Sequence, residues 1–150
     1  MSILLKQLAA GPKFTIYAMV EVPPKTASGL AEPGAGAGNC PVETFFNQCS
    51  QQAIAQLVKR LDHTAQHGPS WNREQCRQLT ANIWEFKTGA GLRLLWFYDK
   101  GQLIICTSGY LKQRQKADKT EIRRAEEWKA KYDQAKATRQ LTVSTENVII

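Results

Sequence analysis

The pattern of hydrophobic and polar positions is most informative between residues 82 and 116, where three short apolar runs are separated by two glycine-containing turns. The turns fall at residues 88–91 and 99–101, and glycine supplies the positive φ that tight hairpins need. The pattern therefore predicts a three-stranded antiparallel meander over this stretch.

Register decides which side chains of the meander share a face. If Lys87 lies directly opposite Arg93, both cations point to the same side of the sheet. One face then holds Glu85, Lys87, Arg93, Leu95 and Phe97, and the other holds Trp84, Phe86, Leu94, Trp96 and Tyr98. We expect the aromatic face to be the core, packed under helices. A shift of one residue would separate the two cations.

Other segments have the periodicity of one strand and two helices. Residues 13–22 alternate as a half-buried strand, which Pro23 ends. Residues 41–62 carry apolar side chains at helical spacing behind Pro41. A second helix is expected to begin at Asp118, with Glu121 completing a capping box.

The remaining segments have weaker patterns. Residues 23–39 are rich in Gly, Ala and Pro and predict a flexible loop. Residues 71–79 are expected to be a loop or a short helix. The tail at 141–150 has some strand character and could add an edge strand, bind a partner or fray. With 150 residues the chain is expected to form a single domain, 1–150.

Composition limits the classes of function. No apolar run is long enough to cross a bilayer, and the aliphatic run Ile3–Leu5 is too short for a signal-peptide core, so we expect a cytoplasmic protein. The four cysteines lie far apart without zinc spacing, and His63 and His67 have no third ligand nearby. We therefore expect buried thiols, no metal and no cofactor.

The charge of the chain is strongly positive, with a formal net charge of +7. Residues 110–140 hold ten Lys or Arg against five Asp or Glu. Such an excess suits a polyanion such as RNA or DNA, but a solvated helix face explains it equally well.

The cations of the meander suggest a phosphate site. Lys87 and Arg93 would share a face, with Lys112 and Arg114 arriving from the end of the last strand. Arginine offers a planar fork for phosphate and lysine a compact charge, while Tyr110 could stack on a base. The plain alternative is that Lys87 and Arg93 form surface ion pairs with Glu85 and other carboxylates.

Two segments resemble the RelE/HigB/ParE superfamily of bacterial toxins, and its HigB-like branch most. IWEFKTGAGLRLLWFYDKGQLIIC is similar to that branch's L-Y-E-L-R … Y-R-V-L-Y-F hairpin, and SGYLKQRQK is similar to its H-G-F-x-K-K-x-Q-K segment. KTEIRRAEEW resembles the following E-I-x-x-A helix. The resemblance covers roughly residues 40–132 and the first strand.

The resemblance implies an α+β, RelE-like domain: a small twisted antiparallel sheet of about four strands with helices packed on one face. It implies a toxin that cleaves mRNA without a metal, usually on the ribosome, and that a cognate antitoxin neutralises. It assigns catalytic roles to Arg93, Lys87, Lys112 and Tyr110. RNA binding falls to Arg114, Lys116 and Ser108.

The chain departs from the family pattern at two positions: Ser108 replaces a frequent His, and Gln113 replaces the second Lys of the K-K pair. Two alternatives therefore stay open beside the ribonuclease. One is a non-catalytic DNA gyrase inhibitor of the ParE kind, and the other is an inactivated nucleic-acid-binding module. Whether the protein forms a homodimer is also open.

Overall fold

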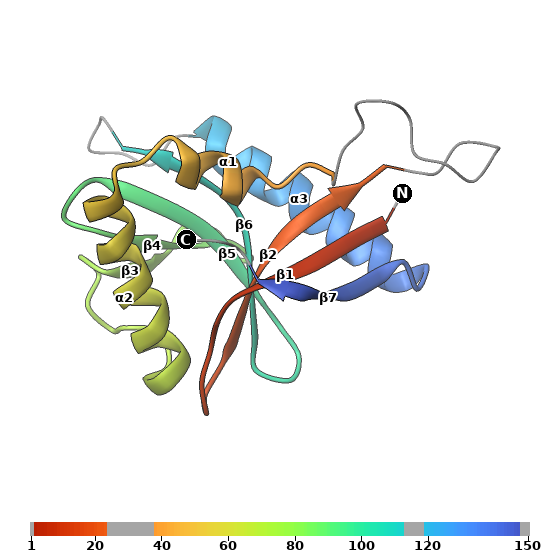
Figure 1. Cartoon of the computed structure of the whole chain (residues 1–150), viewed down its shortest axis with the longest axis horizontal. Helices are drawn as coiled ribbons and strands as arrows, with labels where there is room; N and C mark the ends of the chain where they lie inside the picture. The colour runs from red at the N-terminus through yellow and green to blue at the C-terminus, as the bar shows by residue number, and fades with distance from the viewer. Residues whose placement is uncertain (1, 24–37, 113–118, 148–150) are drawn as a thin grey trace.

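The computed structural model describes residues 2–23, 38–112 and 119–147. It is an α+β fold of three helices and one seven-stranded sheet within these ranges (Figure 1). In chain order the elements are β1 (Ser2–Ala10), β2 (Thr15–Val22), α1 (Pro41–Asn47), α2 (Gln51–His67), β3 (Cys76–Gln78), β4 (Trp84–Lys87), β5 (Leu92–Asp99), β6 (Leu103–Leu111), α3 (Lys119–Ala137) and β7 (Leu141–Asn147). None of these helices is long and apolar enough to cross a membrane.

The sheet is mixed, with the strand order β3-β4-β5-β6-β2-β1-β7. β2 runs parallel to β6, and β7 runs parallel to β1. The expected small antiparallel sheet of about four strands is therefore wrong.

Two strands of the sheet were not predicted from the sequence. β1 was missed because a bulge between Gln7 and Ala9 breaks its period of two. β3, expected to be a loop or a short helix, has only three residues, too few for a periodicity to show.

Helices cover both faces of the sheet, so the expectation of helices on one face is also wrong. In Figure 1, α1 and α2 lie on the viewer's side of the sheet and α3 lies behind it. One core, which includes Phe46, Leu57 and Trp96, fills the space under α1 and α2. A second core, which includes Phe97 and Tyr132, fills the space under α3. Two buried faces explain why Met19 is buried as well as Ile16, Ala18 and Val20, which lie on the opposite face of β2.

The meander is confirmed in its order, turns and register. Lys87 lies directly opposite Arg93. Gly91 and Gly101 close the two turns with φ of 89° and 79°. Trp96 stacks between two other aromatic rings of the α1–α2 face, with centroids 4.8 Å from Phe86 and 5.5 Å from Trp84.

The helix expected over residues 41–62 is two helices. α1 ends at Asn47, and Ser50 starts α2 by accepting a hydrogen bond from the Ala53 amide at 3.2 Å. α2 then continues to His67, beyond the expected end. The predicted cap at Asp118 and most of the predicted 23–39 loop lie outside the described residues. Of the three alternatives for 141–150, the structure shows an edge strand over 141–147.

Gly109 on β6 permits the close approach of α1 to the sheet. A Cβ atom added there would lie 2.2 Å from Cδ2 of Phe45. Gly109→Ala should therefore lower the free energy of unfolding by about 1–3 kcal/mol, because the ring must shift within a packed core. Urea denaturation checks this, with Gly89→Ala as the control, since a Cβ there would meet nothing within 4 Å. Equal midpoints for the two variants would contradict this reading.

Candidate functional site

Two rows of side chains cross the strands on the α3 face of the sheet. Lys87, Arg93 and Tyr110 are directly opposed on β4, β5 and β6. The adjacent row is formed by Arg77, Glu85, Leu95 and Ser108. Directly opposed residues point to the same side of a sheet, so Lys87 and Arg93 share one face, as predicted. We call Arg77, Lys87, Arg93 and Lys112 the basic cluster.

A buried carboxylate lies within the basic cluster. Glu85 is fully buried, and its Oε1 accepts a hydrogen bond from Nε of Arg77 at 3.0 Å. Nε of Arg93 lies 3.7 Å from the same oxygen, an ion pair without a hydrogen bond. Of the ion pairs in the plain alternative, the one between Arg93 and Glu85 is thus present, but it is a buried contact rather than a surface one. Removing one partner of such a pair is costly because it leaves an uncompensated charge.

Arg93 is held from two sides. Its Nη1 donates to the carbonyl oxygen of Leu92 at 3.0 Å and approaches that of Thr88 at 3.4 Å. Its side chain is 11% exposed, so a ligand would reach only the outer edge of the guanidinium. The hairpin turn and Glu85 together fix this edge in place.

Lys112 follows the last residue of β6. Its amide donates to the carbonyl oxygen of Gly91 at 2.9 Å, which holds it beside the β4–β5 turn. Burial lowers the pKa of the Lys112 ammonium, and the positive charges of Arg77 and Arg93 lower it further. A lysine whose pKa is lowered by other cations is a candidate for proton transfer.

The other predicted site residues differ in their surroundings. Lys87 donates from Nζ to the carbonyl oxygen of Arg73 at 3.2 Å. Tyr110 is partly buried and packs against the core under α3. Ser108 is fully buried beside Thr107, with 3.3 Å between their hydroxyl oxygens, so it does not face solvent. Arg114 and Lys116 lie outside the described residues.

Sequence reasoning missed Arg77 and the central place of Glu85. Arg77 joins the cluster only because β3 pairs with β4 and puts it opposite Glu85. A three-residue strand has no detectable periodicity, so no local signal could have placed Arg77 there. Glu85 was visible as an acid on the mixed face, but its burial depends on packing across the sheet.

Many of the cations in residues 110–140 do not join the cluster. Along α3, Lys129 pairs with Asp133 at 2.7 Å, and Lys131 pairs with Glu21 at 2.7 Å. Lys136 pairs with Asp99 at 2.8 Å. These ion pairs account for part of the basic excess as ordinary surface contacts.

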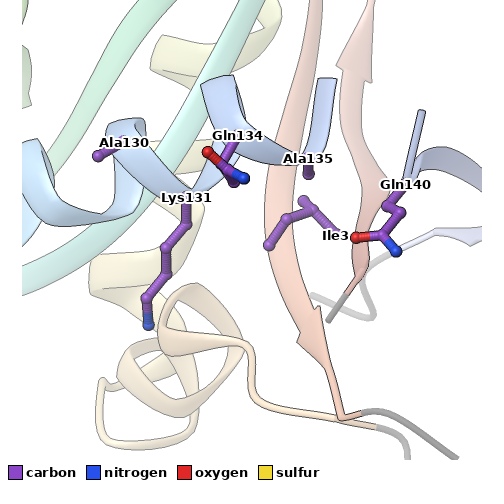
Figure 2. Close-up of a pocket in the computed structure, with 6 residues that line it drawn as sticks. All are labelled: Ile3, Ala130, Lys131, Gln134, Ala135 and Gln140. Atoms are coloured by element: carbon purple, nitrogen blue, oxygen red, sulfur yellow. The ribbon is translucent and has the colours of Figure 1, made fainter. Parts of the chain in front are cut away.

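A separate hollow of about 420 Å³ lies where α3 meets β1. Figure 2 shows its lining: Ile3, Ala130, Lys131, Gln134, Ala135 and Gln140. Lys131 extends away from Ile3 and Ala135 in this view, and its ammonium pairs with Glu21. This ion pair occupies the one lysine of the lining, and none of the described site residues belongs to the hollow.

Within the described residues, no group of three or more His, Cys, Asp or Glu could hold a metal ion. The rings of His63 and His67 lie 4.8 Å apart near the end of α2, and both side chains are exposed. Cys40, Cys76 and Cys106 are buried thiols, and Cys49 is partly buried.

Residues 44–130 match the model of the family described as Phage derived protein Gp49-like (DUF891). The match covers more than half of the chain and includes every member of the basic cluster. It leaves out β2, β1 and β7, the three neighbouring strands at one edge of the sheet. No curated protein matches the chain.

Proposed function

The chain belongs to the Gp49-like phage-derived protein family, part of the RelE/HigB-like toxin superfamily, and from this premise we propose that it is an mRNA endoribonuclease. Membership of this family fits the toxin of a toxin–antitoxin pair and suggests a cognate antitoxin as its partner. The observation that carries the nuclease proposal is the alignment of Lys87, Arg93 and Tyr110 on three adjacent strands, with Lys112 beside them.

The proposed reaction is attack of a ribose 2′-oxygen on the adjacent phosphorus. The bond to the leaving 5′-oxygen breaks, and the products are a 2′,3′-cyclic phosphate and a 5′-hydroxyl. The reaction needs a group that accepts the 2′ proton, a group that protonates the leaving oxygen, and positive charge for the transition state. Side-chain cations supply that charge in the proposal, so it requires no metal.

The geometry supports a division of roles among the cluster. The fixed guanidinium edge of Arg93 would stabilise the negative charge that develops on the phosphoryl oxygens. Lys112, with its lowered pKa, would take part in proton transfer, and Lys87 would bind an adjacent phosphate. The partly exposed ring of Tyr110 would support a base, whereas its hydroxyl oxygen is buried and does not face solvent. Arg114 and Lys116 follow Lys112 in the chain and would extend the RNA contact.

Finer features also belong to this proposal. The protein would belong to the HigB-like branch and would act on ribosome-bound mRNA in the cytoplasm. An antitoxin that covers the basic cluster would neutralise it. A net charge of +7 favours encounter with both RNA and an acidic partner surface.

Induced expression of the intact chain tests the proposal. Growth should stop, and mRNA should be cut at defined sites with cyclic phosphate ends. Co-expression of the short reading frame next to the gene should restore growth if that frame encodes the antitoxin. Intact mRNA together with broken or poorly supercoiled DNA would replace the proposal with gyrase inhibition. Unimpaired growth with RNA binding alone would indicate an inactivated module.

The role of Lys112 predicts a pH dependence. Its pKa is lowered, so the neutral amine becomes available at a lower pH than for an ordinary lysine, and the cleavage rate should rise with pH until that pKa is passed. Lys112→Arg keeps the charge but stays protonated, so this rise should disappear. A pH–rate profile on an oligoribonucleotide measures the effect, with the exposed Lys119→Arg as control. An unchanged profile in Lys112→Arg would assign the proton transfer to another group.

A further inference from the structure

Trp71 is fully exposed, with 100% of its surface accessible. Tryptophan is highly buried on average, and the other three tryptophans of the chain follow this rule. Trp96 and Trp128 are 0% and 5% exposed, and Trp84 is partly buried against the α1–α2 core. A large aromatic ring in solvent costs hydrophobic free energy, so Trp71 suggests a binding surface.

The segment that carries Trp71 has a defined backbone. It connects α2 to β3, and the carbonyl oxygen of Asn72 accepts from the amides of Gln75 at 2.9 Å and Cys76 at 3.0 Å. The Asn72 side chain accepts from the amide of Glu74 at 2.9 Å. These bonds form a compact turn directly after Trp71, which fixes the backbone on that side of the residue.

The turn also contacts the basic cluster. Lys87 donates from its ammonium to the carbonyl oxygen of Arg73 at 3.2 Å, and from its amide to that of Gln75 at 2.9 Å. Trp71 is therefore two residues from a direct contact with Lys87. A ligand bound across Lys87 would pass close to the turn.

A groove of about 280 Å³ begins at the same lysine. Its lining comes from α2, the Asn72 turn and the β4–β5 turn: Gln56, Lys59, Arg60, Glu74, Gln75, Lys87, Thr88 and Gly89. Three cations face one acid in this lining. The Nε of Arg60 is buried and has no hydrogen-bond partner among the described residues. The groove thus combines positive charge with unused donor capacity, which suits an anionic ligand.

We propose that single-stranded RNA continues from the basic cluster on the α3 face, past Lys87 at the end of β4, into this groove beside α2, and that one unpaired base stacks on Trp71. This subsite rests on the proposed function, because it extends the path of the same substrate. Cations that follow a backbone together with an aromatic ring for stacking are the two parts of a sequence-tolerant single-strand site. The three cations of the groove favour an anionic strand over an apolar protein surface as the ligand of this region.

Binding of a non-cleavable oligonucleotide to the purified full chain tests the subsite. The probe is a 2′-O-methyl oligoadenylate of about ten nucleotides, and the matched probe is an abasic strand of equal length. Trp71→Ala should bind the oligoadenylate about five- to a hundredfold more weakly, the range of one lost stacking contact. Its affinity for the abasic strand should stay unchanged. Trp71→Phe should retain most of the affinity, because it keeps an aromatic face.

The groove has a test of its own. Lys59→Ala should weaken both probes and lower the slope of affinity against salt concentration by about one. Equal oligoadenylate affinity for Trp71→Ala and the unaltered chain would overturn the subsite, and so would a loss of abasic binding as large as the loss of oligoadenylate binding. The two proposals can fail separately. A chain that cuts no RNA yet shows the Trp71 effect contradicts only the nuclease, whereas an active nuclease without the Trp71 effect contradicts only the subsite.

Discussion

Arg93→Ala should relieve the growth arrest caused by the intact chain and reduce the rate of RNA cleavage by about a hundredfold or more. The reason is that the outer edge of the Arg93 guanidinium, fixed by the carbonyls of Leu92 and Thr88, would stabilise the charge of the transition state. Cleavage of an oligoribonucleotide by purified protein measures the effect. Arg93→Lys should recover only a small part of the rate, since an ammonium lacks the planar fork.

A control is needed because Arg93 also lies 3.7 Å from the buried carboxylate of Glu85. Removing Arg93 leaves Arg77 as the one salt-bridge partner of Glu85 among the described residues, which destabilises the fold as well as the site. Arg93→Ala combined with Glu85→Gln removes both charges of this contact, so it should recover much of the lost stability without recovering activity. Full activity in Arg93→Ala protein that is folded by circular dichroism would reject the assigned role.

Trp96→Ala should lower the free energy of unfolding by about 3–5 kcal/mol. Trp96 is 0% exposed and packs between Phe86 and Trp84, so its removal leaves a large cavity under α1 and α2. Urea or thermal denaturation measures the loss, which is a large share of the stability of a typical domain. Trp71→Ala is the matched control, because the same side chain is removed from full exposure and should change stability little. A small loss in Trp96→Ala would show that the core collapses around the gap.

The sequence predicted the parts of the fold that depend on local pattern. The β4–β6 meander was found because Gly91 and Gly101 mark its turns and because its strands connect through short hairpins. The parallel pairings were not found, since β2 with β6 and β1 with β7 join segments far apart in the chain. Periodicity says that a face is buried but not which element covers it. The cover of α3 over Leu95 and Phe97 was therefore missed.

The candidate site also has features that local sequence predicted and features that it did not. The shared face of Lys87 and Arg93 followed from register alone. The position of Arg77 was not predictable, because it lies on a strand of only three residues that pairs with β4. The burial of Glu85 was not predictable either, because it follows from packing across several elements. Ser108, expected to contact RNA, is fully buried, because its place opposite Leu95 lies deep within the face. The alternation of residues along a strand shows which face a side chain is on, but not how deeply that side chain is buried.

The parallel pairing of β2 with β6 has a consequence for how the protein is made. β2 holds Thr15 opposite Leu103, so the middle of the sheet cannot close until about two thirds of the chain has left the ribosome. Long-range pairing of this kind slows folding. Until then the β1–β2 hairpin has open edges and apolar faces on both sides, a state prone to aggregation. The strands that carry the basic cluster gain their packed support in the same late step, so a chain that ends before β6 should lack the folded cluster.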